Sequence, residues 1–176
     1  MARVVGKEFA WVYEKPVYER VVGELLPGEK VGQEVGLAGD GWVGLDVMVA
    51  TYSGRARTGS LVFRVKDKLG GSVINEWEIE VEDIEDDLWL RLLLSQPQPQ
   101  LKEDNSVFVE VEAKDTLEGE APTLRYTKDF DYRDSKMLIW KKGDSYRRKE
   151  VNGDLAVRLL YKKGGQIVTD DDTKLL

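Results

Sequence analysis

The stretch that decides the fold is Trp42–Tyr52 (WVGLDVMVATY), in which aliphatic residues recur at every second position. The repeating set is Val43, Leu45, Val47 and Val49. Successive side chains of a β-strand point to opposite faces of its sheet, so this alternation predicts a strand with one face in a core and the other in water.

The same period of two recurs along most of the chain. It is found at 61–66, 75–82, 107–114 and 155–161. These segments are rich in the β-branched and aromatic residues that strands favour. Glycine-containing turn signals lie at 27–28, 39–41, 70–71, 118–119, 142–144 and 152–154, and Asn152-Gly153 is the strongest hairpin signal among them. We therefore predict an all-β fold, an antiparallel two-sheet β-sandwich of the jelly-roll type with about eight to ten strands.

We expect residues 1–176 to form a single β-sandwich domain, with a core at about 8–163 and a flexible acidic C-terminal tail at 164–176. Residues 83–94 (DIEDDLWLRLLL) fit either a short helix or a strand buried on both faces, and their strand-rich surroundings favour the strand. Alternating prolines in 95–100 (SQPQPQ) predict an extended, exposed loop.

The composition excludes several kinds of chemistry. The chain has no histidine and no cysteine, so Ser-His-Asp and Cys-His nucleophiles, zinc fingers and thiol redox pairs are impossible. The formal net charge of −7 makes nucleic acid and anionic membrane poor partners. No apolar run approaches the ~20 residues that cross a bilayer, and the N-terminus does not read as a signal peptide. We expect a cytosolic protein or a piece of a longer chain; an extracytoplasmic or cell-envelope location is favoured if that chain is a membrane protein.

Three segments resemble a known family pattern. Residues 23–35 (GELLPGEKVGQEV) are similar to the opening G-x-L-x-x-G-x-x-x-x-Q-x-[F/V] of certain jelly-roll domains, Trp42–Tyr52 to the strand that follows, and 152–158 with Tyr161 to the closing strand. These galactose-binding-like, carbohydrate-binding-module-like domains are attached to bacterial cell-envelope glycosyltransferases and surface proteins. The resemblance implies a jelly roll with a glycan-binding role, and it carries over no functional residue.

Candidate ligand-binding residues follow from strand parity. Sugar recognition uses an aromatic face for the ring and neighbouring polar groups for the hydroxyls. Parity places even-numbered residues of the first stretch on the face opposite the core, together with Arg64, Phe108 and Arg158, and two further aromatics flank the turn at 142–144. The predicted ligand-binding residues are Trp42, Asp46, Tyr52, Arg64, Trp140 and Tyr146. The alternative is that these aromatics pack in the core or at an edge and that the charges form a solvated face. Trp77 has the apolar parity and is expected in the core.

No cofactor and no catalytic residue are expected. A structural Ca²⁺ stays open as an alternative through Asp129, Asp131 and Asp134, whose loop lacks the central glycine and distal glutamate of an EF-hand. The acidic runs 82–87 and 170–172 are more simply solvated charge.

The sequence favours a non-catalytic carbohydrate-binding-like module with a glycan partner and other domains of the same protein. One alternative is a structural or protein-interaction β-sandwich domain with no glycan ligand. Another is a small hydrolase that uses paired carboxylates.

Overall fold

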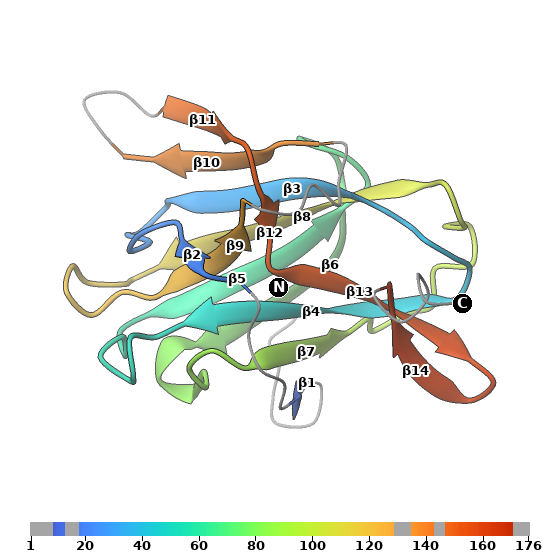
Figure 1. Ribbon diagram of the computed structural model, residues 1–176, viewed down its shortest axis with the longest axis horizontal. Coiled ribbons are helices and arrows are strands. Elements are labelled where there is room, and N and C mark those ends of the chain that lie inside the picture. The colour runs from blue at the N-terminus through green and yellow to red at the C-terminus, as the bar shows by residue number, and fades with distance from the viewer. Residues whose placement is uncertain (1–8, 13–17, 129–134, 143–146, 171–176) are drawn as a thin grey trace.

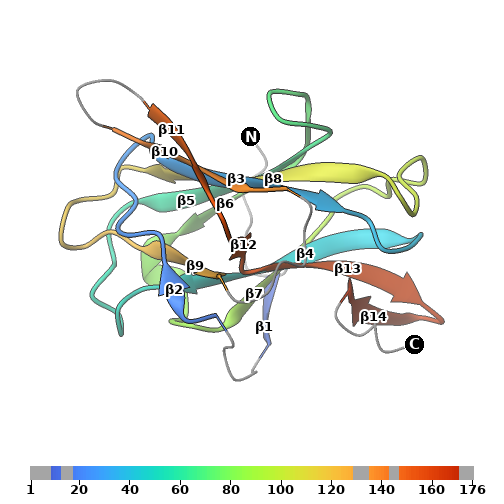
Figure 2. The same ribbon diagram turned by 45° about the horizontal axis from the view of Figure 1, so that its top comes forward.

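The structure is a computed structural model that describes residues 9–12, 18–128, 135–142 and 147–170. These residues form two antiparallel sheets stacked face to face (Figures 1 and 2). The predicted all-β, antiparallel two-sheet sandwich is therefore confirmed. Consecutive strands repeatedly cross from one sheet to the other, which is the connectivity that jelly rolls use.

The first sheet is built around one long central strand. Its order is β1-β7-β4-β13-β14, and β9 pairs with the far end of β4 and with two short strands, β2 and β12. The strands are β1 (Phe9–Val12), β2 (Arg20–Val21), β4 (Trp42–Ala50), β7 (Trp89–Leu93), β9 (Thr123–Thr127), β12 (Asp154–Leu155), β13 (Val157–Lys163) and β14 (Gln166–Thr169).

The second sheet is a six-stranded array with the order β11-β10-β3-β8-β5-β6. Its strands are β3 (Lys30–Gly36), β5 (Ser60–Lys66), β6 (Val73–Glu80), β8 (Ser106–Lys114), β10 (Met137–Lys141) and β11 (Arg147–Val151). A 3₁₀ turn, η1 (Val81–Asp83), follows β6.

The core lies between the two sheets and follows the predicted parity. Inward-facing residues alternate along β5 and β8, as with Phe63 and Val65 on β5 and Val109 and Val111 on β8. Trp77 on β6 is also in this core, as the sequence predicts.

A β-bulge at the start of β4 breaks the parity. Leu160 of β13 pairs with Gly44, but the next residue, Tyr161, pairs with Trp42, so Val43 is an extra residue. The Val43 carbonyl accepts a hydrogen bond from the Leu94 N–H at 2.9 Å. One extra residue turns the side chains of the residues before it to the opposite face of the sheet, so Trp42 points into the core together with Tyr161. The expectation that Trp42 shares the outer face with Asp46 is wrong for this reason.

Two further expectations need correction. Asn152-Gly153 does not close a hairpin, because β11 pairs with β10 in one sheet and β12 pairs with β9 in the other. The two residues instead carry the chain between the layers. Residues 166–169, placed in the flexible tail from sequence, form β14 and pair with β13.

In the ambiguous segment at 83–94 the favoured strand is confirmed at 89–93, and the alternative of a short helix is not, because only Asp83 belongs to a 3₁₀ turn. A single 3₁₀ turn ends at Asp83, and strand β7 occupies 89–93 with both Leu90 and Leu92 in the core. Residues 95–100 form the predicted exposed loop, apart from the half-buried Gln98. Within the described ranges, no helix has the length and apolar character to cross a membrane.

Candidate ligand-binding pocket

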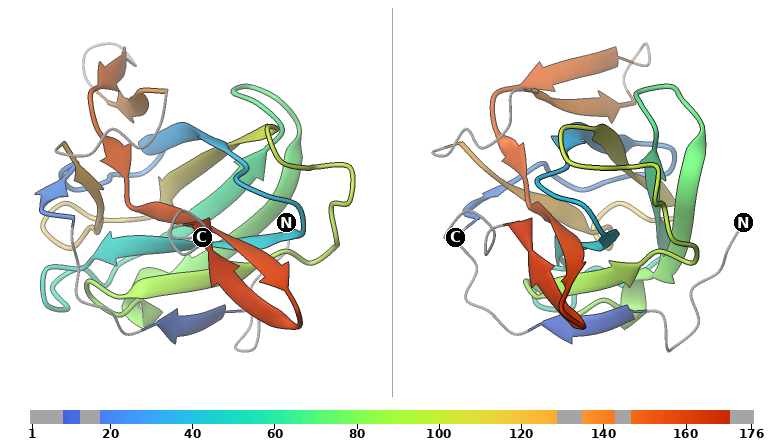
Figure 3. Two further views of the ribbon diagram at one scale, coloured as in Figure 1. Left: turned by 45° about the vertical axis from the view of Figure 1, so that its right-hand side comes forward. Right: turned by 90° about the vertical axis from the view of Figure 1, so that its right-hand side faces the viewer.

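A pocket of about 620 Å³ opens at the end of the sandwich where β4 begins and β7 ends. The loop that follows β7 forms one side of it, and the end of β13 forms part of its rim; Figure 3 shows the β13–β14 hairpin projecting from this end of the molecule. Its volume lies within the ~300–1,000 Å³ typical of small-molecule sites. The lining residues are Asp40, Gly41, Trp42, Val43, Leu94, Gln96, Pro97, Gln98, Pro99, Leu101, Lys102 and Lys162.

Local structure explains why an apolar pocket forms here. The bulge turns Trp42 inward, and its indole Nε1–H donates to the Gly44 carbonyl at 2.8 Å, which fixes the ring at the base of the wall. Trp42 is only 3% exposed, so it forms a wall and not an open stacking platform. The proline-rich loop closes by a turn in which the Leu101 N–H donates to the Gln98 carbonyl at 3.0 Å, and this turn places Leu101 beside the core.

Polar and charged groups gather at the rim of the pocket. One oxygen of Asp40 accepts a hydrogen bond from the Glu103 N–H at 3.0 Å. Lys102 and Lys162 are exposed, and neither forms an ion pair with any carboxylate in the part of the chain that the structure describes. The pocket therefore combines an apolar wall with a rim of hydrogen-bonding groups.

The predicted ligand-binding residues do not form one site. Trp42 lines the pocket, but Tyr52 lies beyond the opposite end of β4. The two residues are ten positions apart in the chain, and at the rise of an extended strand this separates them by about 30 Å. The guanidinium of Arg55 covers the Tyr52 ring, with its carbon 4.6 Å from the ring centroid. Tyr146 lies outside the described residues.

Asp46 is on the outer face of the first sheet, as parity predicts, but it is completely buried. Its two cross-strand neighbours are Arg91 on β7 and Arg158 on β13. Arg91 Nε and Arg158 Nε donate to its two carboxylate oxygens at 2.9 and 2.8 Å. The Arg158 guanidinium also stacks over the Trp89 ring, with its carbon 4.4 Å from the ring centroid. These contacts make Asp46 the centre of a buried ion network and leave it no access to a ligand in this conformation.

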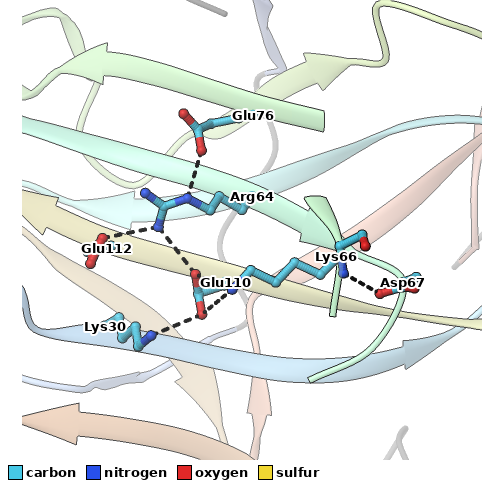
Figure 4. Close-up of polar contacts among 8 residues, drawn as sticks. Lys30, Arg64, Lys66, Asp67, Glu76, Glu110 and Glu112 are labelled. Carbon is cyan, nitrogen blue, oxygen red and sulfur yellow. Dashed lines mark hydrogen bonds and ion pairs between the residues drawn. The ribbon is translucent and has the colours of Figure 1, made fainter. Parts of the chain in front are cut away.

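Arg64 lies on the outer face of the six-stranded sheet, so it cannot share a groove with Asp46 on the outer face of the first sheet. Figure 2 shows the two sheets as separate layers. Figure 4 shows the ion network around Arg64, in which it contacts Glu76 at 2.7 Å, Glu112 at 3.1 Å and Glu110 at 3.2 Å. Burial acts to lower the pKa of Arg64, but the hydrogen bonds to Glu76 and Glu112 and the charges of both carboxylates together outweigh it, so the pKa is raised above its ordinary value. The expectation of a single groove lined by Trp42, Asp46 and Arg64 is therefore wrong.

Glu110 is the buried centre of this second network. Its carboxylate is 3.4 Å from Lys30 Nζ and 3.2 Å from both Arg64 and Lys66. Burial acts to raise the pKa of Glu110, but the charges of Lys30 and Lys66 and the hydrogen bonds from Lys66 and Arg64 outweigh it, so the pKa lies below its ordinary value of 4.5. A general acid in a glycosidase needs the opposite shift.

Glu110→Gln is expected to cost about 1–3 kcal/mol of unfolding free energy at pH 7, because three cations lose their shared carboxylate. The pKa of Glu110 is lowered in the folded state, so its contribution is present above about pH 4.5 and is lost as the pH falls through the folded-state pKa. Denaturant titrations between pH 3 and pH 7 should therefore show a flatter pH dependence for the variant. Glu34→Gln, at an exposed carboxylate of β3, is the control and should change neither the free energy of unfolding at pH 7 nor its dependence on pH. An unchanged pH profile for Glu110→Gln would contradict this account.

Trp140 packs against neighbours on the outer face of the six-stranded sheet. Its ring meets Phe108 edge to face with centroids 6.4 Å apart, and Lys30 Nζ lies 5.0 Å from its centroid. Phe108 in turn covers Gly32, where an added Cβ would come within 2.6 Å of the phenyl ring. Phe108 thus leaves the core as parity predicts. Trp140, for which packing in the core or at an edge is the alternative to ligand binding, packs on the outer face, where the two rings cover the sheet and each other.

The alternative calcium loop cannot be placed, because Asp129, Asp131 and Asp134 lie outside the described residues. Elsewhere in the described chain, no group of three or more acidic side chains has an arrangement that could hold a metal ion. The acidic run at 82–87 has structural partners: Asp86 accepts hydrogen bonds from the Thr51 and Ser53 N–H groups, and Asp87 pairs with Arg125.

Sequence reasoning missed most of the pocket. Of its lining residues, only Trp42 is predicted as a ligand contact. Parity predicts it on the outer face of the sheet, whereas the β-bulge turns it inward against the pocket. The proline-rich segment at 95–100 is the signal that could have pointed to the site, since ordered loops at the end of a sandwich commonly carry binding residues. No protein-family model and no curated protein matches this chain.

Proposed function

We propose that this chain is a non-catalytic carbohydrate-binding-like module that takes one sugar residue of a glycan into the pocket between the start of β4 and the proline-rich loop. The observation that carries the proposal is the pocket itself, with apolar walls and a polar rim. The module would belong to a larger envelope or glycan-processing protein.

The chemistry of a pyranose ring suits this arrangement. One side of the ring presents C–H groups, which would lie against Leu94, Pro97 and Leu101. Hydroxyl groups at the ring edge would reach the rim, where Gln98 and Lys162 offer donors and Asp40 offers a carboxylate. Because the wall lacks an exposed aromatic platform, a single site would bind weakly, and useful affinity would require several modules or several glycan repeats.

The test is a glycan array followed by titration of the hits, with and without Ca²⁺. Leu101→Arg, which places a long charged side chain in the wall, is expected to abolish binding. Gln98→Ala combined with Lys162→Ala is expected to weaken it about tenfold through lost rim hydrogen bonds.

Leu117→Arg is the matched control, because Leu117 is exposed and lies outside the pocket lining. It should bind as the wild type does. If the wild-type protein binds no glycan on the array under either condition, the proposal fails. Binding that survives Leu101→Arg unchanged would place the ligand elsewhere.

A further inference from the structure

The charge of this chain is unevenly distributed. Residues 136–151 contain six lysines and arginines and two acidic residues, a local net charge of +4 within a chain of net charge −7. The rest of the chain therefore carries −11. The segment at 136–151 contains strands β10 and β11, which pair antiparallel and are here called the β10–β11 hairpin.

The hairpin lies at one edge of the six-stranded sheet (Figure 1). β11 is the terminal strand, and among the described residues it pairs only with β10. The backbone N–H and C=O groups along its other side therefore have no strand partner in the described structure. Such an edge can accept a further extended chain.

Several cations of the hairpin are not neutralised. Lys141 is paired with Glu29 at 2.9 Å, and Lys136 is 3.9 Å from Glu150. Lys142, Arg148 and Lys149 are exposed and form no ion pair with any residue that the structure describes. These three side chains, here called the basic edge, are available to an anionic partner.

The basic edge presents charge on both faces of the sheet. In the register of the two strands, Arg148 lies opposite Trp140, whose side chain is on the outer face of the sheet. Lys149 lies opposite Ile139, whose side chain packs in the core. Neighbouring residues of a strand point to opposite faces, so a ligand that contacts both cations must span the edge. A polypeptide added as a strand does this, and it also supplies partners for the free backbone groups.

Protection against aggregation is a general reason for charge on an edge strand. The opposite edge of the same sheet, however, carries acidic residues. On β6, Glu76 pairs with Arg64 at 2.7 Å and Glu78 pairs with Lys114 at 3.2 Å. Either sign of charge would protect an edge, so protection does not account for unpaired positive charge at one edge and paired negative charge at the other.

We propose that the basic edge binds an acidic, extended polypeptide segment, which adds to β11 as a further strand. This surface is separate from the pocket, and the proposal does not depend on glycan binding. Acidic side chains of the segment neutralise Arg148 and Lys149 on the two faces, and Lys142 holds a third carboxylate beyond the end of β10.

The test uses the whole chain and a fluorescent oligo-glutamate peptide of about twelve residues at low ionic strength. Arg148→Glu combined with Lys149→Glu is expected to weaken binding at least tenfold. Lys142→Glu alone, outside either strand, is expected to weaken it about threefold. Added salt should weaken binding by the wild type, because exposed charges are screened.

The matched control is Lys68→Glu combined with Lys163→Glu, which changes the net charge equally at exposed lysines away from the hairpin. It should bind within twofold of the wild type. On titration with the peptide, the backbone amide signals of 136–142 and 147–151 should shift in the NMR spectrum, and far-UV circular dichroism checks that each variant is folded.

Three results would overturn the proposal. The first is that the peptide does not bind. The second is an equal loss of binding in the control variant, which would indicate a general effect of net charge. The third is binding to dextran sulfate without binding to oligo-glutamate, which would identify an anionic polysaccharide surface and exclude strand addition by a peptide.

Discussion

Asp46→Ala is expected to lower the free energy of unfolding by about 3–5 kcal/mol. The Asp46 carboxylate is fully buried, and the side chain of Arg158 beside it is 5% exposed. Removing one member of a buried ion network leaves the opposite charges desolvated without compensation. In this protein two guanidiniums lose the same carboxylate.

Two comparisons separate this effect from simple loss of volume. Asp46→Asn keeps the size and one oxygen acceptor, so it is expected to cost less than the alanine variant while still costing more than 1 kcal/mol. Glu118→Ala removes an exposed carboxylate and should be neutral within about 0.5 kcal/mol. Equilibrium unfolding in guanidinium chloride, followed by far-UV circular dichroism, measures the free energy of unfolding of all three variants. A cost below 1 kcal/mol for Asp46→Ala would show that water or neighbouring groups readily replace the carboxylate.

Trp77→Ala is expected to cost a similar 3–5 kcal/mol, for a different reason. Trp77 is 1% exposed and is among the largest fully buried side chains. Its Nε1–H also donates to the Leu93 carbonyl at 3.1 Å, so it joins β6 of one sheet to β7 of the other. Truncation leaves a cavity between the sheets and removes a hydrogen bond between them.

Trp77→Phe keeps most of the ring and removes the donor, so it should cost about 1–2 kcal/mol. Trp140→Ala is the matched control, because the same truncation is made at a half-buried residue on the outer face. It should cost less than half as much as Trp77→Ala in the same denaturation experiment. Equal losses at the two tryptophans would contradict the assignment of Trp77 to the central core.

Side-chain parity predicted the central core of the sandwich well. It correctly placed Phe63, Trp77 and Val109 between the sheets, because regular strands keep their period of two over their whole length. It failed at Trp42, where one extra residue reverses the facing of the strand end. A bulge depends on the register with β13, more than one hundred residues away in sequence, and the local alternation carries no sign of it.

The prediction of solvated outer faces was incomplete for another reason. Asp46 and Glu110 have the outward parity that the sequence indicates, yet both are buried. In each case long arginine or lysine side chains from neighbouring strands extend over the carboxylate. Period-two reasoning assigns a face to a residue, but burial on that face depends on cross-strand neighbours, which come from distant segments. The candidate site was less predictable still, because its loop joins elements that only the folded chain brings together.

The pairing of β4 has a consequence for how the chain acquires its structure. Val47 lies between Leu90 on one side and Val157 on the other, and the second partner is 110 positions further along the chain. Pairings of such long range place the protein among domains of high contact order, which fold in milliseconds to seconds. During synthesis the central strand stays uncovered on one side until β13, residues 157–163, has left the ribosome. A nascent chain arrested before residue 157 would therefore expose a long apolar strand edge and be prone to aggregate.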